Sequence, residues 1–198
     1  MARILSLEPA EGGTLIELDP YGEMICKGDL SPLKSLVGIE LDEEGEADLW
    51  RTLVTPALND GAATLAMRPL TRKLLIEKLV SKGHDELLAE RAADKLEDYG
   101  AIDDAEYARL FAQERQLRGW GSIRIRNELR HRGVDDEMID EVLDELGSNE
   151  EAIESFIISR AKEGLLDRKA AKKVSDALMR KGFRWDEISP ILREYTEE

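Results

Sequence analysis

The chain has 198 residues, of which 36% are charged and 5% aromatic, and its formal net charge is −15. This composition is typical of a helix-rich globular protein, and the length is sufficient to bury a substantial core. The single cysteine, Cys26, excludes a disulfide framework and a thiolate metal cluster and favours a reducing compartment. No apolar run approaches the roughly 20 residues of a membrane helix, and no charged-then-apolar leader opens the chain. We therefore expect a cytoplasmic protein without a membrane partner.

Residues 2–30 differ in pattern from the rest of the chain. Short apolar or alternating runs are separated by turn residues at Pro9–Gly13 and Asp19–Gly22, which predicts a β-meander of about three strands. A sheet of this size is marginal alone and is expected to pack on the helix that follows. The acidic run Leu41–Glu46 comes next and predicts a solvated, partly flexible linker. An acidic mimic of nucleic acid is the alternative, supported by charge alone.

A helical pattern begins near Ala47 and continues to the end of the chain. Pro56 and Gly61 interrupt it, which predicts that the first complete helix starts near Leu58 and ends before Pro69. Later helices have clearer start signals. Ser122, for example, is predicted to cap the helix that follows it.

One apolar pattern occurs three times along the chain. In its middle copy, Ile125 and Leu129 precede Gly133 by eight and four residues, and a second helical face follows the glycine. The same arrangement surrounds Gly83 and Gly182. Units of this kind cannot bury their apolar faces alone and must stack on one another. The pattern predicts a mainly α-helical solenoid of three tandem three-helix repeats after the β-meander, divided into residues 1–45 (β-rich extension and acidic linker), 46–101, 102–147 and 148–198.

Charge is distributed unevenly. Residues 1–60 contain 13 acidic and 4 basic side chains, whereas the later residues separate the two signs. Six arginines lie between Arg115 and Arg132 with Glu128 as the only acidic residue, and nine Lys or Arg lie between Arg160 and Arg184 with three acidic residues. A net charge of −15 argues against strong binding of phosphate groups. The separation nevertheless gives each repeat a basic middle helix and an acidic last helix.

The basic middle helices and the residues just before and after them carry the candidate contact residues. Trp120 is included because the other repeats have no aromatic counterpart at its position. The alternative is structural, because the acidic last helices can pair with these cations. The candidates are Arg115, Arg118, Trp120, Arg124, Arg126, Arg130 and Arg132 in the middle repeat, and Arg168, Lys169, Lys172, Lys173, Arg180 and Lys181 in the third.

Catalytic patterns are missing from the sequence. No glycine-rich phosphate loop follows a strand, and His84 and His131 have no second ligand at metal-binding spacing. Asp103 and Asp104 stand where a helix begins, so they fit a capping role better than a catalytic carboxylate pair. We therefore predict a protein that is not an enzyme and needs neither cofactor nor metal.

The middle repeat also has a distinctive motif, which reads Ile102-Asp103-Asp104-x-x-Tyr107-Ala108 and then Gly119-x-Gly121-x-x-Arg124-Ile125-x-x-Glu128-Leu129-x-x-x-Gly133-Val134. This motif resembles the central signature of the RecX family of recombinase regulators. Weaker similarity to the same family extends over the first repeat, at Arg68-Pro69-Leu70-Thr71, and over the third, at Leu178-x-x-Lys181-Gly182-Phe183.

The resemblance implies a modulator that binds the RecA recombinase and its filament on DNA. Such a protein limits filament extension, ATP hydrolysis and strand exchange in DNA repair and the SOS response. The resemblance also implies an elongated, curved stack of repeats, and we expect a monomer with only weak DNA contact of its own. The rival interpretation is a stand-alone DNA-binding module, and a third is a protein scaffold unrelated to recombination. The RecA interpretation predicts that changing Arg124, Arg126 and Arg130 together to glutamate abolishes inhibition of RecA.

Overall fold

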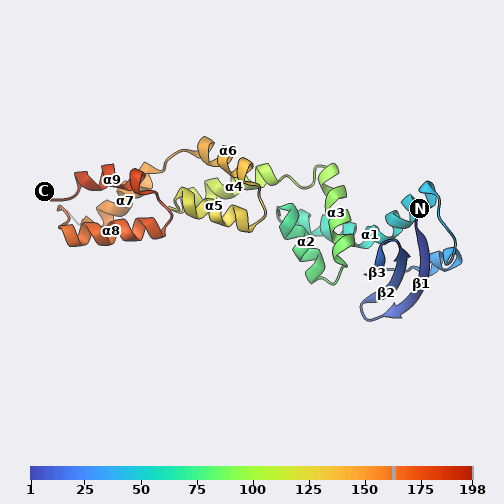
Figure 1. Cartoon of the computed structure of the whole chain (residues 1–198). Helices are drawn as coiled ribbons and strands as arrows, with labels where there is room; N and C mark the ends of the chain where they lie inside the picture. The colour runs from blue at the N-terminus through green and yellow to red at the C-terminus, as the bar shows by residue number, and fades with distance from the viewer. Residues whose placement is uncertain (162–163, 198) are drawn as a thin grey trace. The chain divides into compact units, whose positions relative to one another are not determined.

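The structure is a computed structural model that describes residues 1–161 and 164–197. In those residues the chain forms a three-stranded sheet followed by nine α-helices (Figure 1). The predicted mainly α-helical fold with a small amino-terminal β-meander is confirmed. The chain divides into two compact units, Met1–Asp103 and Asp104–Glu198. None of the helices in the described part of the chain has the length and apolar character that a membrane crossing requires.

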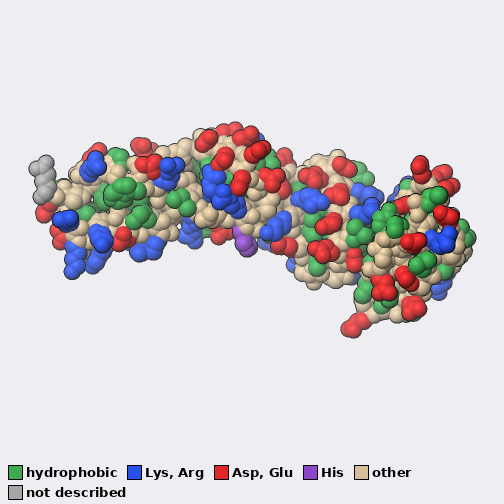
Figure 2. Space-filling model, viewed as in Figure 1, with side chains coloured by type: hydrophobic (Ala, Val, Ile, Leu, Met, Phe, Trp, Pro, Cys, Tyr) green, Lys and Arg blue, Asp and Glu red, His purple; other side chains and the backbone are tan. Residues whose placement is uncertain are grey.

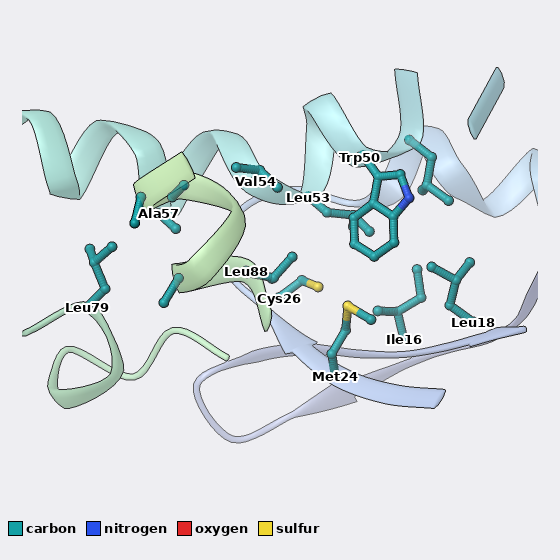
Figure 3. Packing of buried hydrophobic residues seen from close by; sticks show 14 of the residues in the cluster. Ile16, Leu18, Met24, Cys26, Trp50, Leu53, Val54, Ala57, Leu79 and Leu88 are labelled. Atoms are coloured by element: carbon teal, nitrogen blue, oxygen red, sulfur yellow. The ribbon is translucent and has the colours of Figure 1, made fainter. Parts of the chain in front are cut away.

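The first unit begins with the antiparallel sheet. Its strands β1 (Arg3–Ala10), β2 (Gly13–Asp19) and β3 (Gly22–Cys26) pair in chain order. One face of the sheet is apolar and buried, and Figure 3 shows its side chains directed toward the helix α1. A short 3-10 helix, η1 (Ser31–Leu36), then leads toward α1. The sheet therefore belongs to the core of the first unit, as a sheet too small to be stable alone requires.

The helix α1 (Glu43–Met67) is continuous, so the prediction of a helix starting near Leu58 was wrong. Asp42 caps it, because its side chain accepts a hydrogen bond of 2.9 Å from the backbone N–H of Gly45. The acidic run expected to be a flexible linker mostly forms the first turn of this helix. Carboxylates at that position are favoured by the positive end of the helix dipole.

Packing explains why neither Pro56 nor Gly61 ends α1. A proline inside a helix costs about 3 kcal/mol or more, because its ring crowds the preceding turn and one hydrogen bond is lost. Leu53, Val54 and Ala57 are buried beside Pro56, and burying such side chains offsets that cost. Gly61 allows α3 to approach closely, since a Cβ at this position would lie 2.7 Å from Cδ1 of Leu96.

The helices α2 (Arg72–Ser81) and α3 (Glu86–Asp98) complete the first repeat, and both begin at side-chain caps. Just before α3, His84 is buried, and its Nε2 lies 2.7 Å from a carboxylate oxygen of Asp60 on α1. This hydrogen bond is the main reason why the pKa of Asp60 is below its usual range. His84 therefore joins the end of the α2–α3 turn to α1, which is a structural role.

Cys26 lies at the end of β3 with its side chain in the core. Burial raises the pKa of its thiol to about 12, and the nearby carboxylate of Asp85 acts in the same direction. We expect a thiol-specific reagent to label the native protein only as fast as the first unit opens, and the urea-unfolded protein at the rate of a free cysteine. Absorbance-monitored labelling measures both rates. Rapid labelling of the native protein would contradict the buried position.

The second unit contains two three-helix groups with separate cores. The first group consists of α4 (Asp104–Leu117), α5 (Ser122–His131) and α6 (Asp136–Leu146). The second consists of α7 (Glu150–Ala161), α8 (Arg168–Arg180) and α9 (Trp185–Glu194). The predicted cap of α5 was wrong: Gly121 occupies the N-cap position without a side-chain bond, and Ser122 is the first helical residue.

The two groups of the second unit meet backbone to backbone. The N–H of Gly121 donates to the carbonyl oxygen of Lys181 at 2.9 Å, and the N–H of Ile123 donates to that of Gly182 at 3.0 Å. Two of the free N–H groups at the start of α5 are thus satisfied by the turn that follows α8. The approach depends on glycine, because a Cβ at Gly121 would lie 2.2 Å from the carbonyl carbon of Gly182.

Candidate partner-binding surface

The turn between α4 and α5 places Trp120 between two arginines. The guanidinium carbon of Arg124 lies 3.7 Å from the centroid of the indole ring, and that of Arg115 lies 4.9 Å from it. Arg115 also lies 4.7 Å from the ring of Phe111, so this arginine is held between two aromatic side chains. Cations over aromatic faces are attracted by the ring quadrupole. Trp120 is partly buried against the core of its repeat, so it has a packing role, and its contact with a partner stays a prediction.

Two of the candidate arginines on α5 form ion pairs with the acidic helix α6. Arg126 pairs with Asp140, and Arg130 pairs with Asp136 at 2.5 Å. The hydrogen bond between Arg130 and Asp136 lowers the pKa of the carboxyl group and raises that of the guanidinium. The structural alternative raised by the sequence therefore holds for these two arginines. Because both pairs are largely exposed to solvent, each contributes little to stability.

The remaining arginines of the middle repeat also have local contacts. Arg118, in the turn just after α4, pairs with Glu114 of that helix at 2.5 Å. Arg132 lies 3.5 Å from Glu128, donates to the hydroxyl of Tyr107 at 3.1 Å, and stands over the ring of Phe111. Much of the positive charge of this repeat is thus already matched within the repeat.

Helix α8 differs from α5, because its exposed cations have no such partners in the part of the chain that the structure describes. No carboxylate of residues 1–161 and 164–197 lies within 4.0 Å of the charged nitrogens of its exposed basic residues. Figure 2 shows Lys and Arg side chains gathered along α8, and Asp and Glu side chains gathered over α6. We call this group the α8 surface, and it consists of Arg168, Lys169, Lys172, Lys173 and Arg180.

The position of these cations opposes the stability of the helix that carries them. Arg168 and Lys169 open α8, whose first turn contains no acidic residue. The N-terminus of a helix carries the positive end of its dipole, and a cation there is disfavoured by about 0.3–1 kcal/mol at an exposed site. Local stability therefore does not account for the placement of these two residues.

The structure brings one residue of the third repeat beside the Trp120 turn. A Cβ at Gly119 would lie 3.7 Å from Nζ of Lys181, which also stands 5.3 Å from the ring of Phe156. The candidates Arg115, Trp120, Arg124 and Lys181 thus cluster where the two repeats meet. The α8 surface is a separate group on the third repeat.

Sequence patterns missed residues whose position depends on contacts between repeats. A cavity of about 480 Å³ lies where α5 and α6 meet the start of α9, and Arg126, Asp144, Arg184 and Glu187 are among its lining residues. Both signs of charge line it, so it does not select an anion. Arg193, on the exposed side of α9, was also missed, because a lone arginine among acidic neighbours carries no pattern.

Comparison with known proteins agrees with this architecture. A family model described as RecX, second three-helix domain, matches residues 103–143, which cover α4, α5 and most of α6. The regulatory protein RecX of Halorhodospira halophila is 35% identical over 136 residues, covering 67% of this chain and 84% of that protein. This chain belongs to the RecX family. The regulatory protein RecX of Clostridium acetobutylicum is 32% identical over 139 residues, covering 65% of this chain and 63% of that protein.

Solved structures of RecX proteins share the fold. A crystal structure of a regulatory protein RecX aligns with 96% of this chain and 98% of its own, with a TM-score of 0.65 and 22% identity. RecX from Lactobacillus salivarius aligns with 72% of this chain and 96% of its own, with a TM-score of 0.64 and 24% identity. At these identities the likeness concerns the fold alone. The membership of this chain in the RecX family, a family of regulatory proteins, rests on the sequence relatives.

Proposed function

We propose that this protein regulates the RecA recombinase in the cytoplasm by binding RecA and its filament on DNA. It limits filament extension, ATP hydrolysis and strand exchange, and it performs no chemistry of its own. The observation that carries the proposal is membership in the RecX family, whose relatives are named regulatory proteins. In this proposal residues 46–101, 102–147 and 148–198 act as three repeats, and residues 1–45 cover one end of the array.

The α8 surface is the contact region that we propose first. It presents five exposed cations, and no described carboxylate lies within ion-pair distance of them. The cluster of Arg115, Trp120, Arg124 and Lys181 is the second contact region. A filament of recombinase on DNA offers phosphate groups to such surfaces. Complementary charge of this kind directs encounter and orientation more than it raises affinity.

The sequence suggests changing Arg124, Arg126 and Arg130 together to glutamate, but ion pairs inside the middle repeat complicate the result of that experiment. Glutamate in place of Arg126 or Arg130 would face Asp140 or Asp136, so that variant both removes cations and introduces repulsion inside the repeat. A loss of RecA inhibition in that variant would have two explanations. Arg124→Glu alone is the cleaner substitution, since Arg124 is stacked on Trp120 and forms no ion pair with a described carboxylate.

The test is ATP hydrolysis by RecA filaments on single-stranded DNA, titrated with this protein, together with its binding to the same DNA without RecA at matched salt. We expect inhibition at a protein concentration well below that of RecA, with weak binding to naked DNA. Unchanged hydrolysis at equimolar protein would contradict the proposal.

A stand-alone DNA-binding module is the second candidate, and the cations of α8 are the observation that favours it. The salt dependence of binding distinguishes the two functions. A protein with about 6–10 phosphate contacts loses roughly 10³–10⁵ in affinity between about 50 and 200 mM salt. Inhibition that disappears in parallel with naked-DNA binding across that range would favour the DNA-binding module.

A further inference from the structure

A groove runs between α8 and α9 on the third repeat. Its volume is about 330 Å³, which is at the lower end of the range for sites that hold small ligands or single anchoring side chains. The lining residues are Ala171, Lys172 and Ser175 from α8, and Trp185, Ser189, Leu192, Arg193 and Thr196 from α9 and the residues after it.

The lining residues follow one stripe on each helix. On α9 the lining residues Trp185, Ser189 and Leu192 or Arg193 are spaced by three or four residues, and on α8 the lining residues Ala171 and Lys172 are followed by Ser175. Each set therefore lies on one side of its helix and faces the other across the groove. Trp185 to Arg193 spans roughly 12 Å at 1.5 Å per residue. Figure 2 shows hydrophobic side chains gathered on this repeat between α9 and the basic side chains of α8. The groove is therefore long enough for a short segment of peptide.

The wall of the groove contains an exposed tryptophan. Trp185 is 56% exposed, although it is the largest apolar side chain of its repeat. Three hydroxyls line the groove, and two of them are already bonded: that of Ser175 donates to the carbonyl oxygen of Lys172 at 2.9 Å, and that of Thr196 donates to the carbonyl oxygen of Leu192 at 2.7 Å. A large apolar side chain inserted here would cover Trp185, Ala171 and Leu192. Exposed aromatic side chains beside a pocket are typical of the residues that dominate binding at protein interfaces.

The rim of the groove is positively charged. Lys172 and Arg193 stand on opposite walls, and Arg168 lies one turn before Lys172 on the same stripe of α8. Among residues 1–161 and 164–197, neither Lys172 nor Arg193 has a carboxylate within 4.0 Å, and none of the residues that line the groove is acidic. A segment that enters the groove therefore meets one cation on each wall and an apolar surface between the two cations.

We propose that the α8–α9 groove binds an acidic peptide segment that inserts one large apolar side chain beside Trp185. Its carboxylates pair with Lys172 on one wall and Arg193 on the other, while the inserted side chain covers Ala171 and Leu192. This mode combines an apolar anchor with a charged rim, which is the usual anatomy of a peptide-binding groove. It is a property of the isolated protein and does not require that RecA supply the segment.

A peptide fits the groove better than nucleic acid does. Stacking of a base needs an open aromatic face with cations that follow a continuous backbone. Here the tryptophan lines a groove together with Ala171 and Leu192, and the two lining cations stand on different helices instead of following one continuous line. The net charge of −15 also opposes attraction of a polyanion at physiological salt more than attraction of a short acidic peptide.

The test is fluorescence anisotropy with a fluorescein-labelled short peptide that carries one phenylalanine flanked on both sides by glutamates. We expect saturable binding to the full chain. Trp185→Ala, and separately Lys172→Glu with Arg193→Glu, should each weaken binding at least about tenfold. Ser189→Trp, which fills the groove without removing a contact, should do the same. Far-UV circular dichroism of each variant checks that the helices are retained.

The matched control reverses two charges on the neighbouring stripe of the same helix. Lys169→Glu with Lys173→Glu should weaken peptide binding by less than about threefold, because neither residue lines the groove. If the Lys169→Glu, Lys173→Glu variant loses as much peptide affinity as the Lys172→Glu, Arg193→Glu variant, general charge explains the binding and the proposal is overturned. The proposal is also overturned if a peptide with serine in place of phenylalanine binds as tightly. Displacement of the peptide by single-stranded oligothymidylate in a Trp185-dependent manner would assign the groove to nucleic acid. Absence of peptide binding, with a dimer in light scattering that Trp185→Ala abolishes, would assign it to a second copy.

Discussion

Replacement of Gly121 by alanine is expected to disrupt the junction between the two repeats of the second unit. The new Cβ would lie 2.2 Å from the carbonyl carbon of Gly182, and no backbone can yield that much without losing the hydrogen bonds across the junction. The φ angle of Gly121 is −84°, which alanine adopts freely, so the effect is one of contact alone. Overpacking of this kind costs about 1–3 kcal/mol or more. Urea-induced unfolding followed by circular dichroism measures the loss.

Gly164→Ala is the matched control for this substitution. The atom nearest to its added Cβ is the carbonyl oxygen of Ala161, 4.0 Å away, and its φ angle lies outside the region that favours glycine. Alanine there is expected to leave the free energy of unfolding unchanged or to raise it by about 0.4–1 kcal/mol, because it reduces the freedom of the unfolded chain. Equal stability of Gly121→Ala and Gly164→Ala would contradict the close approach of the two repeats.

Reversing three charges on α8 is expected to abolish most RecA inhibition without destabilising the protein. Arg168→Glu, Lys169→Glu and Lys173→Glu together remove much of the α8 surface while leaving the Lys172 rim of the groove intact. Because the first two positions lie at the positive end of the helix dipole, glutamate there favours the helix. We therefore expect the concentration needed for half-inhibition of RecA ATP hydrolysis to rise at least about tenfold. The thermal midpoint should stay equal or increase.

The control for that variant changes the same net charge elsewhere. Lys34→Glu, Arg51→Glu and Arg68→Glu alter three exposed positions of the first unit, which the proposed contact does not use. Inhibition should remain within about twofold of the unmodified protein. If both triple variants lose inhibition to the same degree, general electrostatic repulsion is responsible, and the α8 surface has no special role.

Repetition in the sequence was sufficient to predict where the middle helix of each three-helix group ends. Gly83, Gly133 and Gly182 follow the middle helices, and each has a positive φ angle that glycine adopts readily. The structural effect of Pro56 could not be predicted from the sequence pattern. Local propensity argues for a break at that position, whereas the helix continues because its neighbours are buried. Burial against other parts of the first unit is not visible in a local pattern.

The candidate surface was predictable in composition but not in detail. Clustered charges correctly located two basic helices, α5 and α8. The sequence did not reveal that Arg126 and Arg130 pair with α6 while the α8 surface remains unpaired among the described residues. Such pairing depends on how two helices cross, and the spacing along one helix does not encode it. The α8–α9 groove was missed for the same reason, since its two walls come from different helices.

Direct binding to RecA filaments tests the central claim most simply. RecA is assembled on immobilised single-stranded DNA, and association of this protein is compared with association to the same DNA without RecA, at about 50 and 200 mM salt. Regulation by protein contact predicts strong binding to the filament at the higher salt, where binding to naked DNA is lost. Equal binding to both surfaces, with the same steep loss at higher salt, would contradict it and favour the stand-alone DNA-binding module.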